Sequence, residues 1–314
     1  MECKIGIIIP AYKIQFINQT FQSIQAQTNK NFNLYVFDDC SPYEIKDVFD
    51  KYFTHWSNAY YHRFDDNLGK KNLVSHWNRC LDNVKEEWVW LFSDDDMMTP
   101  TCVDDFYNTI CFRQNIVKDV LRFNWKVIDE NNVIVHSCNE YEQDMTATEY
   151  FYRLFYLRNI DARLQEFIFR SKKLKEIGGF LPFDFAWRSD NATVMSMTYP
   201  NNIHTISGNG EVLWRLSTVN ISGAYSKDSI VRKNFATIEF FNWVENFYKK
   251  NNENIELSKN DLFYMYATHL IPINGCLTWK HVIDLSFKSI AIDTIINWVR
   301  FIYVFHVFKN RNNC

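Results

Sequence analysis

The apolar stretch Trp88-Val-Trp-Leu-Phe92 runs directly into Ser93-Asp94-Asp95-Asp96. Five consecutive apolar or aromatic residues predict a strand buried on both faces. The acids after it would lie at the carboxyl edge of a sheet, where open α/β sheets bind ligands. Because adjacent carboxylates repel one another, they favour a hard divalent cation facing a phosphate-bearing ligand. The alternative is a solvated acidic loop in which Asp96 or Thr99 caps a helix beginning at Pro100.

Strand and helix patterns alternate before this stretch. Residues 5–9 and 34–37 are short apolar runs, and residues 16–24 between them carry apolar side chains at three- and four-residue spacing. This order predicts a right-handed βαβ unit with parallel strands. The alternation continues with a helix over 43–52, a strand at 59–62 and a helix over 73–84. The second strand ends in Asp38-Asp39, so this acidic pair would share the edge with the later acids.

Composition limits the class of protein. The 314 residues, 47% hydrophobic and 23% charged, suit one large α/β unit with an appended segment, or two domains. A net charge of -3 argues against nucleic-acid binding. Aromatic residues, at 17%, would fill a core, stack on sugars or contact a membrane edge. Eight cysteines without a Cys-x-x-Cys pair, and no signal-like N-terminal segment, indicate a reducing cytoplasm.

Four short motifs carry a more specific signal. They are Ile7-Ile-Ile-Pro-Ala-Tyr12, Val36-Phe-Asp-Asp-Cys-Ser41, Asn67-Leu-Gly69 continuing to Asn78, and Leu91 to Pro100. Their order resembles the inverting family 2 glycosyltransferases of the GT-A fold, of the bacterial surface-polysaccharide type. The likeness runs from about residue 4 to 110 and resumes at Gly178-Gly-Phe180. Since no Gly-x-Gly-x-x-Gly or Gly-Lys-Ser/Thr loop is present, phosphate would be held by metal and side chains.

The resemblance implies a mixed, mainly parallel sheet flanked by helices. A catalytic domain would cover residues 1–230, with a nucleotide-binding half over about 1–115 and an acceptor half over about 116–230. A helical C-terminal region would cover 231–314. In the acceptor half, the pattern predicts a helix over 101–115 and a hairpin of 120–128 with 133–136 on one sheet edge. It also predicts the elements 146–158 (helix), 166–169 (strand), 171–177 (helix), 203–206 (strand) and 211–216 (strand).

The resemblance also assigns a donor site. Pro10, Ala11 and Tyr12 would line the base pocket, with Tyr12 stacking on a pyrimidine or, alternatively, only covering the core. Asp39 would accept a hydrogen bond from the base imide, and Asp38 would hold the strand end or the ribose. Buried acids need hydrogen-bond donors, which a uracil or ribose would supply. Further contacts to the nucleotide sugar are expected from Asn67, Gly69, Lys70, Asp94, Asp95 and Arg215.

The metal motif departs from the family's usual Asp-x-Asp-Asp. Ser93 stands where its first acid would fall, and Cys40 replaces the usual Gly of the earlier motif. Three acids remain, so the resemblance still implies a Mn²⁺ or Mg²⁺ cofactor. Asp95 and Asp96 are the expected metal ligands, with Asp94 contacting the ribose or supporting the other two.

Asp190 is the expected catalytic base. In the resembled family, the Gly-Gly-Phe turn is followed by an acid near the acceptor, and here Gly178-Gly-Phe180 leads to Asp190 with Ser189 before it. An inverting transfer needs one carboxylate to take the proton of the attacking hydroxyl. Asp184 is the rival residue, and a helix-capping role is the alternative for Asp190.

The C-terminal part predicts a lid and helices. Residues 217–230 are rich in Ser, Gly and Asn, which suits a loop that orders on donor binding and excludes water, with Arg215 closing over the diphosphate. Helical periodicity starts at about residue 231, and further helices are expected over 262–277 and 282–308. The last is too short and interrupted to cross a bilayer, which takes about 20 apolar residues. It would lie at a membrane interface or pack on the catalytic domain.

These observations predict a metal-dependent inverting transferase. It would move a sugar from a nucleotide diphosphate sugar, UDP-linked by expectation, to a hydroxyl of a glycan or lipid-linked glycan. The context would be polysaccharide biosynthesis for the cell envelope, in the cytoplasm or peripherally at the inner face of the membrane. The alternatives are a sugar-1-phosphate nucleotidyltransferase, whose Gly-rich basic loop is absent, and an inactive glycan- or partner-binding module, which would be expected to lose the acids.

Overall fold

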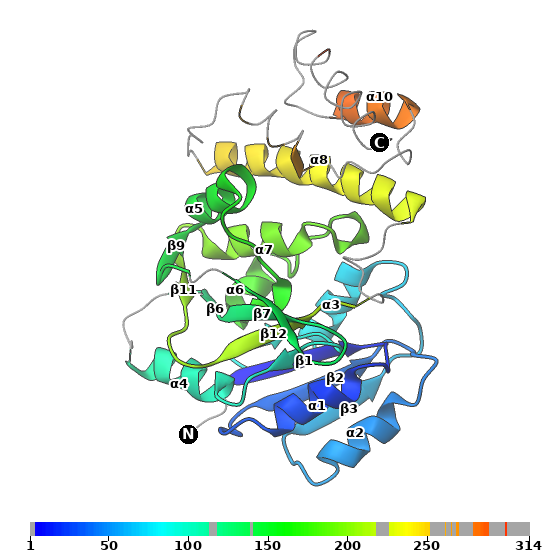
Figure 1. Cartoon of the computed structure of the whole chain (residues 1–314), viewed down its shortest axis with the longest axis vertical. Helices are drawn as coiled ribbons and strands as arrows, with labels where there is room; N and C mark the ends of the chain where they lie inside the picture. Colours follow the sequence, from blue (N-terminus) through cyan, green and yellow to red (C-terminus); the bar gives the residue numbers. More distant parts are fainter. Residues whose placement is uncertain are drawn as a thin grey trace.

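The N-terminal part of the chain alternates strands and helices as predicted (Figure 1). The structure, a computed structural model, describes residues 4–112, 118–138, 141–217, 226–251 and 279–288, with residues 261, 265, 268, 269 and 299. The parallel strands are β1 (Ile5–Ala11), β2 (Asn33–Asp38), β3 (Ala59–Arg63) and β4 (Trp88–Leu91). The helices between them are α1 (Ile17–Gln25), α2 (Ile45–Phe53) and α3 (Leu73–Leu81). The predicted βαβ unit is confirmed.

The main sheet is mixed. Within the described residues it has eight strands in the order β3-β2-β1-β4-β10-β6-β11-β9. The later strands are β6 (Val120–Arg122), β9 (Asp144–Thr146), β10 (Phe167–Arg170) and β11 (Asn202–Thr205). Since β10 runs antiparallel to β4, the residues just before β10 lie beside the end of β4 that carries the acids. This architecture confirms the predicted fold class.

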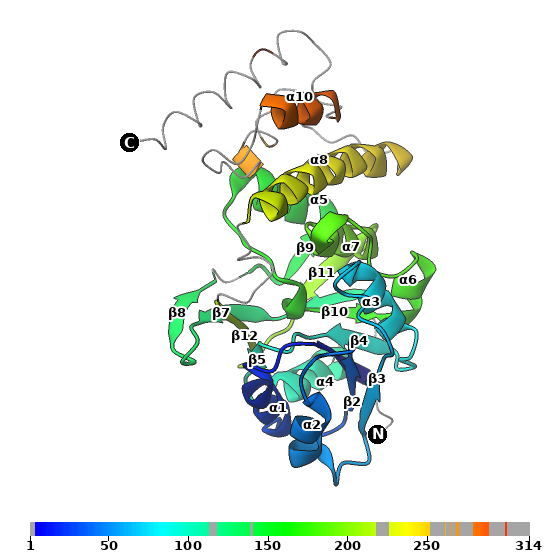
Figure 2. The ribbon, with the colours of Figure 1, turned by 90° about the vertical axis from the view of Figure 1, so that its right-hand side faces the viewer.

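A second sheet corrects one prediction. The run 120–128 is not a single strand, because the chain leaves the main sheet at Phe123. The amide of Phe123 donates to the Glu166 carbonyl oxygen (2.9 Å), and its ring is fully buried. The hairpin of β7 (Asn124–Ile128) and β8 (Ile134–Ser137) therefore extends away from the main sheet (Figure 2). It belongs to a sheet ordered β5-β12-β7-β8, with β5 (Met97–Met98) and β12 (Glu211–Arg215).

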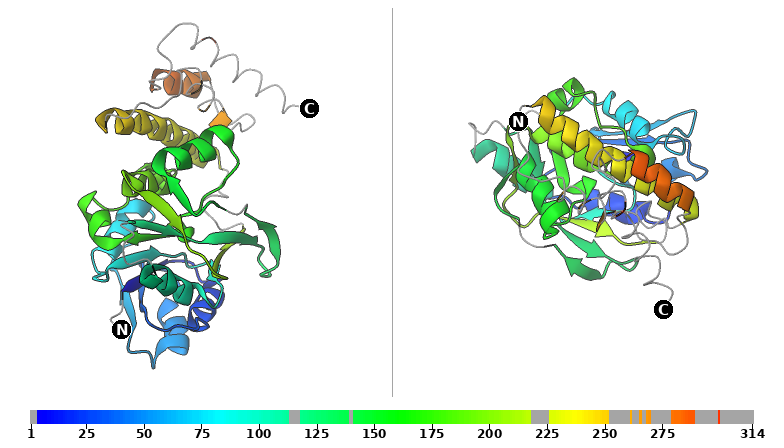
Figure 3. Two further views of the ribbon diagram at one scale, coloured as in Figure 1. Left: turned by 90° about the vertical axis from the view of Figure 1, so that its left-hand side faces the viewer. Right: turned by 90° about the horizontal axis from the view of Figure 1, so that it is seen from above.

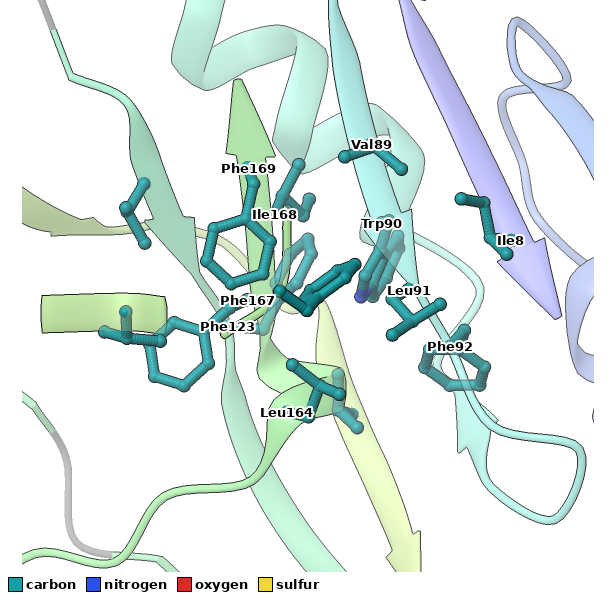
Figure 4. Packing of buried hydrophobic residues seen from close by; sticks show 14 of the residues in the cluster. Ile8, Val89, Trp90, Leu91, Phe92, Phe123, Leu164, Phe167, Ile168 and Phe169 are labelled. Atoms are coloured by element: carbon teal, nitrogen blue, oxygen red, sulfur yellow. The ribbon is translucent and has the colours of Figure 1, made fainter. Parts of the chain in front are cut away.

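Aromatic side chains fill the core where the two sheets meet (Figure 4). The ring of Trp90 stacks on Phe123, with ring centres 5.1 Å apart, and meets Phe92 edge to face at 5.4 Å. Its indole nitrogen donates to the Gln165 carbonyl oxygen (2.6 Å), so this large ring is buried with its polar group satisfied. The core thus accounts for part of the aromatic excess and ties β4 to the residues before β10.

Six further α-helices occur within the described residues. They are α4 (Cys102–Phe112), α5 (Ala147–Phe151), α6 (Ser171–Glu176), α7 (Ser189–Thr198), α8 (Lys227–Lys250) and α10 (Trp279–Lys288). Helix α5 is capped at its N-terminus, since the Thr146 hydroxyl accepts from the Glu149 amide (3.0 Å). The described cysteines Cys40, Cys80, Cys102, Cys111 and Cys138 are free thiols, as expected.

Helix α8 contacts the turn 184–188 that precedes α7. Arg232 forms an ion pair with Asp184 (2.7 and 2.9 Å), and the Trp187 indole nitrogen donates to the Thr237 hydroxyl (3.1 Å). Phe240 and Phe241 pack on Phe151 and Phe155. Figure 3 shows α8 crossing this end of the molecule, with α10 beyond it.

Some predictions for the C-terminal part stay open. The helix expected from about residue 231 is confirmed and begins at Lys227, capped by the Ser226 hydroxyl. The boundary at residue 230 stays a prediction. Most of the expected lid (217–230) and of the helices over 262–277 and 282–308 lies outside the described residues. Within the described residues, none of the helices has the length and apolar character needed to cross a membrane.

Candidate functional site

The acidic loop, residues 93–96, follows β4 at the carboxyl edge of the main sheet. Asp94, Asp95 and Asp96 are 3%, 4% and 1% exposed. The alternative of a solvated acidic loop is therefore wrong. The capping alternative is wrong as well, because α4 begins at Cys102 and the Thr99 hydroxyl donates to the Asn209 carbonyl oxygen. Three buried carboxylates need compensating groups, and the surrounding chain shows which residues supply them.

Asp94 binds the loop after β1. Its Oδ2 accepts hydrogen bonds from the backbone amides of Tyr12 (2.8 Å) and Lys13 (2.7 Å). The Lys13 ammonium lies 3.3 Å from Asp94 Oδ1 and forms an ion pair with Asp95. Burial lowers the pKa of Lys13, but the attraction of Asp94 and Asp95 outweighs burial and raises it above its ordinary value. Burial raises the pKa of Asp94, although Lys13 acts against this.

Asp96 is only partly compensated. Its Oδ1 accepts from the Arg215 amide (2.7 Å), whereas its Oδ2 is buried without a hydrogen-bond partner. Burial, and next the charge of Asp95, raise the pKa of Asp96 well above its ordinary value. The Arg215 guanidinium is buried and donates to the carbonyl oxygens of Asp95 and Asp129 and to Asn132 Oδ1 (2.7 to 2.8 Å). In this structure Arg215 holds the acidic loop, and its contact with a diphosphate stays a prediction.

The acidic loop fits a hard divalent cation. The unpartnered buried Oδ2 of Asp96 is the kind of oxygen that such a cation coordinates. Within the described ranges, no three His, Cys, Asp or Glu side chains are grouped so as to hold a metal ion. Mg²⁺ sites commonly use one or two protein carboxylates and take further ligands from substrate phosphate and water. Asp95 and Asp96 are the residues that would hold the ion.

The second acidic pair is compensated by the protein. Asp39 accepts from the amides of Leu68 (3.0 Å) and Gly69 (2.8 Å) and pairs with Arg79. Asp38 accepts from the Ser41 amide (2.7 Å), the Tyr61 hydroxyl (2.5 Å) and Arg63 (2.6 Å). Neighbouring groups of the protein therefore already supply donors of the kind that a uracil or ribose was expected to supply. Their contacts with a nucleotide stay predictions.

The other predicted nucleotide residues lie on two neighbouring loops. Tyr12 is exposed (39%) and Pro10 partly exposed, whereas the Ala11 side chain is fully buried. The Asn67 side chain accepts from the Lys70 amide (2.8 Å), and the Lys70 side chain is exposed. A Cβ on Gly69 would lie 2.5 Å from Asp39 Oδ2, so the close approach to Asp39 requires glycine. Because the Asp39 amide donates to the Ala11 carbonyl oxygen (2.9 Å), these loops are joined.

Asp190 lies in the first turn of α7 and is partly exposed. The capping position is Arg188, and Asp190 Oδ1 accepts from the Asn191 amide (2.8 Å), so Asp190 does not cap the helix. Burial raises the pKa of Asp190, while the Asn191 amide and the charges of Arg188 and Arg163 act in the opposite direction. The rival Asp184 is paired with Arg232, which lowers its pKa.

Arg163 acts on Asp190 through its charge and lies against β12. The Arg163 guanidinium, whose charge acts on Asp190, lies 4.7 Å from the ring centre of Trp214. Trp214 precedes Arg215, which binds Asp96 through its amide. Arg163 is therefore a neighbour of the strand that holds the acidic loop, and a cleft shared by Asp190 and that loop stays a prediction.

A family model decides which family this chain belongs to. The model described as "Glycosyl transferase family 2" matches residues 6–177, which span β1 to α6 and include the acidic loop. The chain belongs to glycosyl transferase family 2. It is a glycosyltransferase with a GT-A fold, as the motifs predicted. No curated protein sequence matches this glycosyltransferase.

Solved structures share the fold of this glycosyltransferase. S. aureus TarS 1–349 in complex with UDP-GlcNAc matches with a TM-score of 0.60 at 15% identity, over 99% of this chain and 91% of that one. The mannosyltransferase PcManGT from Pyrobaculum calidifontis, in complex with GDP-Man and Mn²⁺, matches with a TM-score of 0.53 at 12% identity, over 98% and 76%. Both structures contain a nucleotide sugar.

Sequence reasoning missed several charged residues of this glycosyltransferase. Lys13 follows a predicted nucleotide loop, and its position after the end of β1 is the signal that could have pointed to the acids after β4. Arg163 and Arg188 had no recognisable motif. The buried pair of Arg122 and Glu166 (2.9 Å) was equally hidden, because it joins β6 to the residue before β10.

Proposed function

We propose that this glycosyltransferase moves a sugar from a nucleotide diphosphate donor, UDP-linked, to a hydroxyl of a glycan or lipid-linked glycan, with inversion. The observation that carries the proposal is the acidic loop, in which three buried carboxylates lie against the loop bearing the exposed Tyr12. TarS binds UDP-GlcNAc and PcManGT binds GDP-Man in their structures, which supports a nucleotide-sugar donor. The family context supports polysaccharide biosynthesis for the cell envelope.

The residues of the site would bind different parts of the donor. Tyr12 stacks on the base, with Pro10 and the Ala11 backbone beside it, while Asp38 and Asp39 shape the neighbouring loop together with Asn67, Gly69 and Lys70. Asp94 anchors the loop after β1 and contacts the ribose. Asp95 and Asp96 hold Mn²⁺ or Mg²⁺. When bound, the ion supplies positive charge that stabilises the departing diphosphate.

Asp190 is the proposed base. Its partial exposure lets it reach an acceptor hydroxyl, and its raised pKa makes it a better proton acceptor than an ordinary carboxylate. Asp184 is less suited, since its carboxylate is engaged by Arg232. Asp190 takes the hydroxyl proton while that oxygen attacks the anomeric carbon from the face opposite the diphosphate.

The C-terminal region would act at the membrane. We propose peripheral contact at the inner face of the cytoplasmic membrane, because a lipid-linked acceptor is available there. Ile283 and Phe287, spaced four residues apart on α10, are 38% and 78% exposed. A cosedimentation assay with lipid vesicles tests this part of the proposal, and absence of binding would remove it.

The test of the proposed function is donor turnover. Purified protein is incubated with UDP-GlcNAc, UDP-glucose, UDP-galactose and GDP-mannose, with Mn²⁺ or with EDTA, and sugar release is followed. We expect hydrolysis of a UDP-sugar only with the ion. Asp190→Asn should lose about 10²- to 10⁴-fold in rate while UDP binding stays unchanged. Asp82→Asn, at an exposed carboxylate after α3, is the control and should retain most of the rate. Absence of both turnover and nucleotide binding would overturn the proposal.

A further inference from the structure

Lys13 lies where a cation is needed in the acidic loop. Its ammonium is 3.3 Å from Asp94 Oδ1 and is paired with Asp95, one of the two proposed metal ligands. Both carboxylates are nearly buried, with side-chain exposures of 4% and 6%. The ammonium therefore compensates charge at the oxygens that a divalent cation would use.

The Lys13 side chain can reach solvent. It is 26% exposed, far more than the carboxylates it contacts. Its backbone is fixed independently, since the amides of Tyr12 and Lys13 both donate to Asp94 Oδ2. Rotation about the side-chain bonds can move the ammonium away from Asp95 without moving the loop. The nitrogen would then reach solvent, or an anion bound beside the loop.

The charge balance sets the condition for that movement. Three carboxylates and one ammonium leave two negative charges in the acidic loop, apart from Arg215. A divalent ion that binds alone must compete with the Lys13 ammonium for Asp95, because the two positive charges repel each other when both lie at the same carboxylate. A diphosphate arriving with the ion brings further negative charge, which the displaced ammonium can pair with.

We propose that Lys13 competes with the divalent cation for Asp95 in the free protein and transfers to the donor's diphosphate when metal and nucleotide bind together. The inference rests on the proposed function and adds a role for a residue outside the predicted site. Its consequence is that metal binding depends on the nucleotide. The ion binds weakly alone and tightly with UDP, so the metal site is filled mainly when the nucleotide is also bound.

The test measures binding of the ion rather than turnover. Affinity for Mn²⁺ is determined from the electron paramagnetic resonance signal of free Mn²⁺, with and without UDP, for the wild-type protein and Lys13→Met. We expect Lys13→Met to bind Mn²⁺ alone about tenfold more tightly, a typical size for coupling between two sites. The factor by which UDP tightens Mn²⁺ binding should fall by a similar amount, because the ammonium no longer links the two ligands.

Two further variants control the comparison. Lys172→Met removes a lysine on α6 whose side chain is 87% exposed, and it should bind Mn²⁺ like the wild-type protein. Lys13→Arg keeps the positive charge and should also keep the weak affinity for Mn²⁺ alone. Thermal unfolding in EDTA shows whether each variant is folded. If the Met variant does not fold, Lys13→Gln replaces it in the comparison.

The outcomes separate the two proposals. If the wild-type protein binds Mn²⁺ and UDP together but the folded Met or Gln variant binds Mn²⁺ no more tightly, the role of Lys13 is refuted and the proposed function stands. If the wild-type protein binds neither ligand and turns over no donor, the proposed function fails. Tighter Mn²⁺ binding in Lys13→Arg would also refute the role of Lys13, because charge would then not be the cause.

Discussion

Replacing Gly179 by alanine should destabilise the protein by about 3 kcal/mol, and most of this loss should come from one side chain, Asn78. Gly178 and Gly179 end α6 with φ of +94° and +86°, which L residues rarely adopt. The two glycines differ in what a Cβ would meet. At Gly178 there is nothing within 4 Å, whereas at Gly179 the Cβ would lie 2.4 Å from Asn78 Oδ1 and 2.8 Å from its Cγ.

The magnitude follows from the contacts of Asn78. Its Oδ1 accepts from the Phe180 amide (2.7 Å), and its Nδ2 donates to the Phe180 carbonyl oxygen (3.0 Å). The amide group cannot stay in place beside a new Cβ, so both hydrogen bonds are lost, at about 1 kcal/mol each. Backbone strain at positive φ adds about 1 kcal/mol at either glycine. Gly178→Ala should therefore cost about 1 kcal/mol and Gly179→Ala about 3 kcal/mol.

Urea unfolding of both variants beside the wild-type protein measures the difference. Because both substitutions introduce similar backbone strain, the difference between their free energies of unfolding reports the loss of the Asn78 hydrogen bonds. Asn78→Ala supplies a third comparison, because in that background the extra cost of Gly179→Ala should disappear. Equal destabilisation by the two glycine substitutions would refute the reasoning, as would an undiminished effect of Gly179→Ala in the Asn78→Ala background.

Two further predictions concern buried acids. Asp96→Asn should weaken Mn²⁺ binding in the presence of UDP at least about tenfold without lowering the urea midpoint, because it removes a buried, partly unpaired charge; Mn²⁺ binding at wild-type strength would show that Asp96 is not a ligand. Burial raises the pKa of Glu166 from 4.5 to about 8, so the folded state keeps a proton that the unfolded chain releases above its own pKa. The stability that the proton on Glu166 gives to the folded state is fully present below pH 4.5 and is lost as the pH rises through about 8. Glu166→Gln should therefore flatten the fall of the urea midpoint across this range, and an unchanged slope would contradict the assignment.

The N-terminal half could be predicted because its signals are local. Strands β1, β2 and β4 are short runs rich in apolar residues, and the helices between the strands carry apolar stripes, so this part of the fold followed from residues close in sequence. Family motifs located the acidic loop in the same way, since its three acids are adjacent.

The errors arose where distant residues decide the outcome. The strand-like sequence over 120–128 gives no sign that Phe123 turns the chain into a second sheet. That turn depends on the Glu166 carbonyl oxygen and the Trp90 ring. The partners of Asp39 come from residues 68, 69 and 79 and were equally invisible. A single lysine after a loop resembles ordinary surface, so the contact of Lys13 with Asp95 required the pairing of β1 with β4.

The contacts of α8 with the turn 184–188 bear on how this protein can be recombined with its relatives. Phe185, Ala186 and Arg188 all have positive φ, a costly backbone for residues with side chains. Partners from α8 hold this turn, namely Arg232 on Asp184 and Thr237 on Trp187. A chimera that joined the first 226 residues to a foreign tail would remove these α8 partners from Asp184 and Trp187, six and three residues before Asp190. Exchanging the front of the chain alone would then remove the contacts that hold the turn before α7, so α8 has to be exchanged together with it.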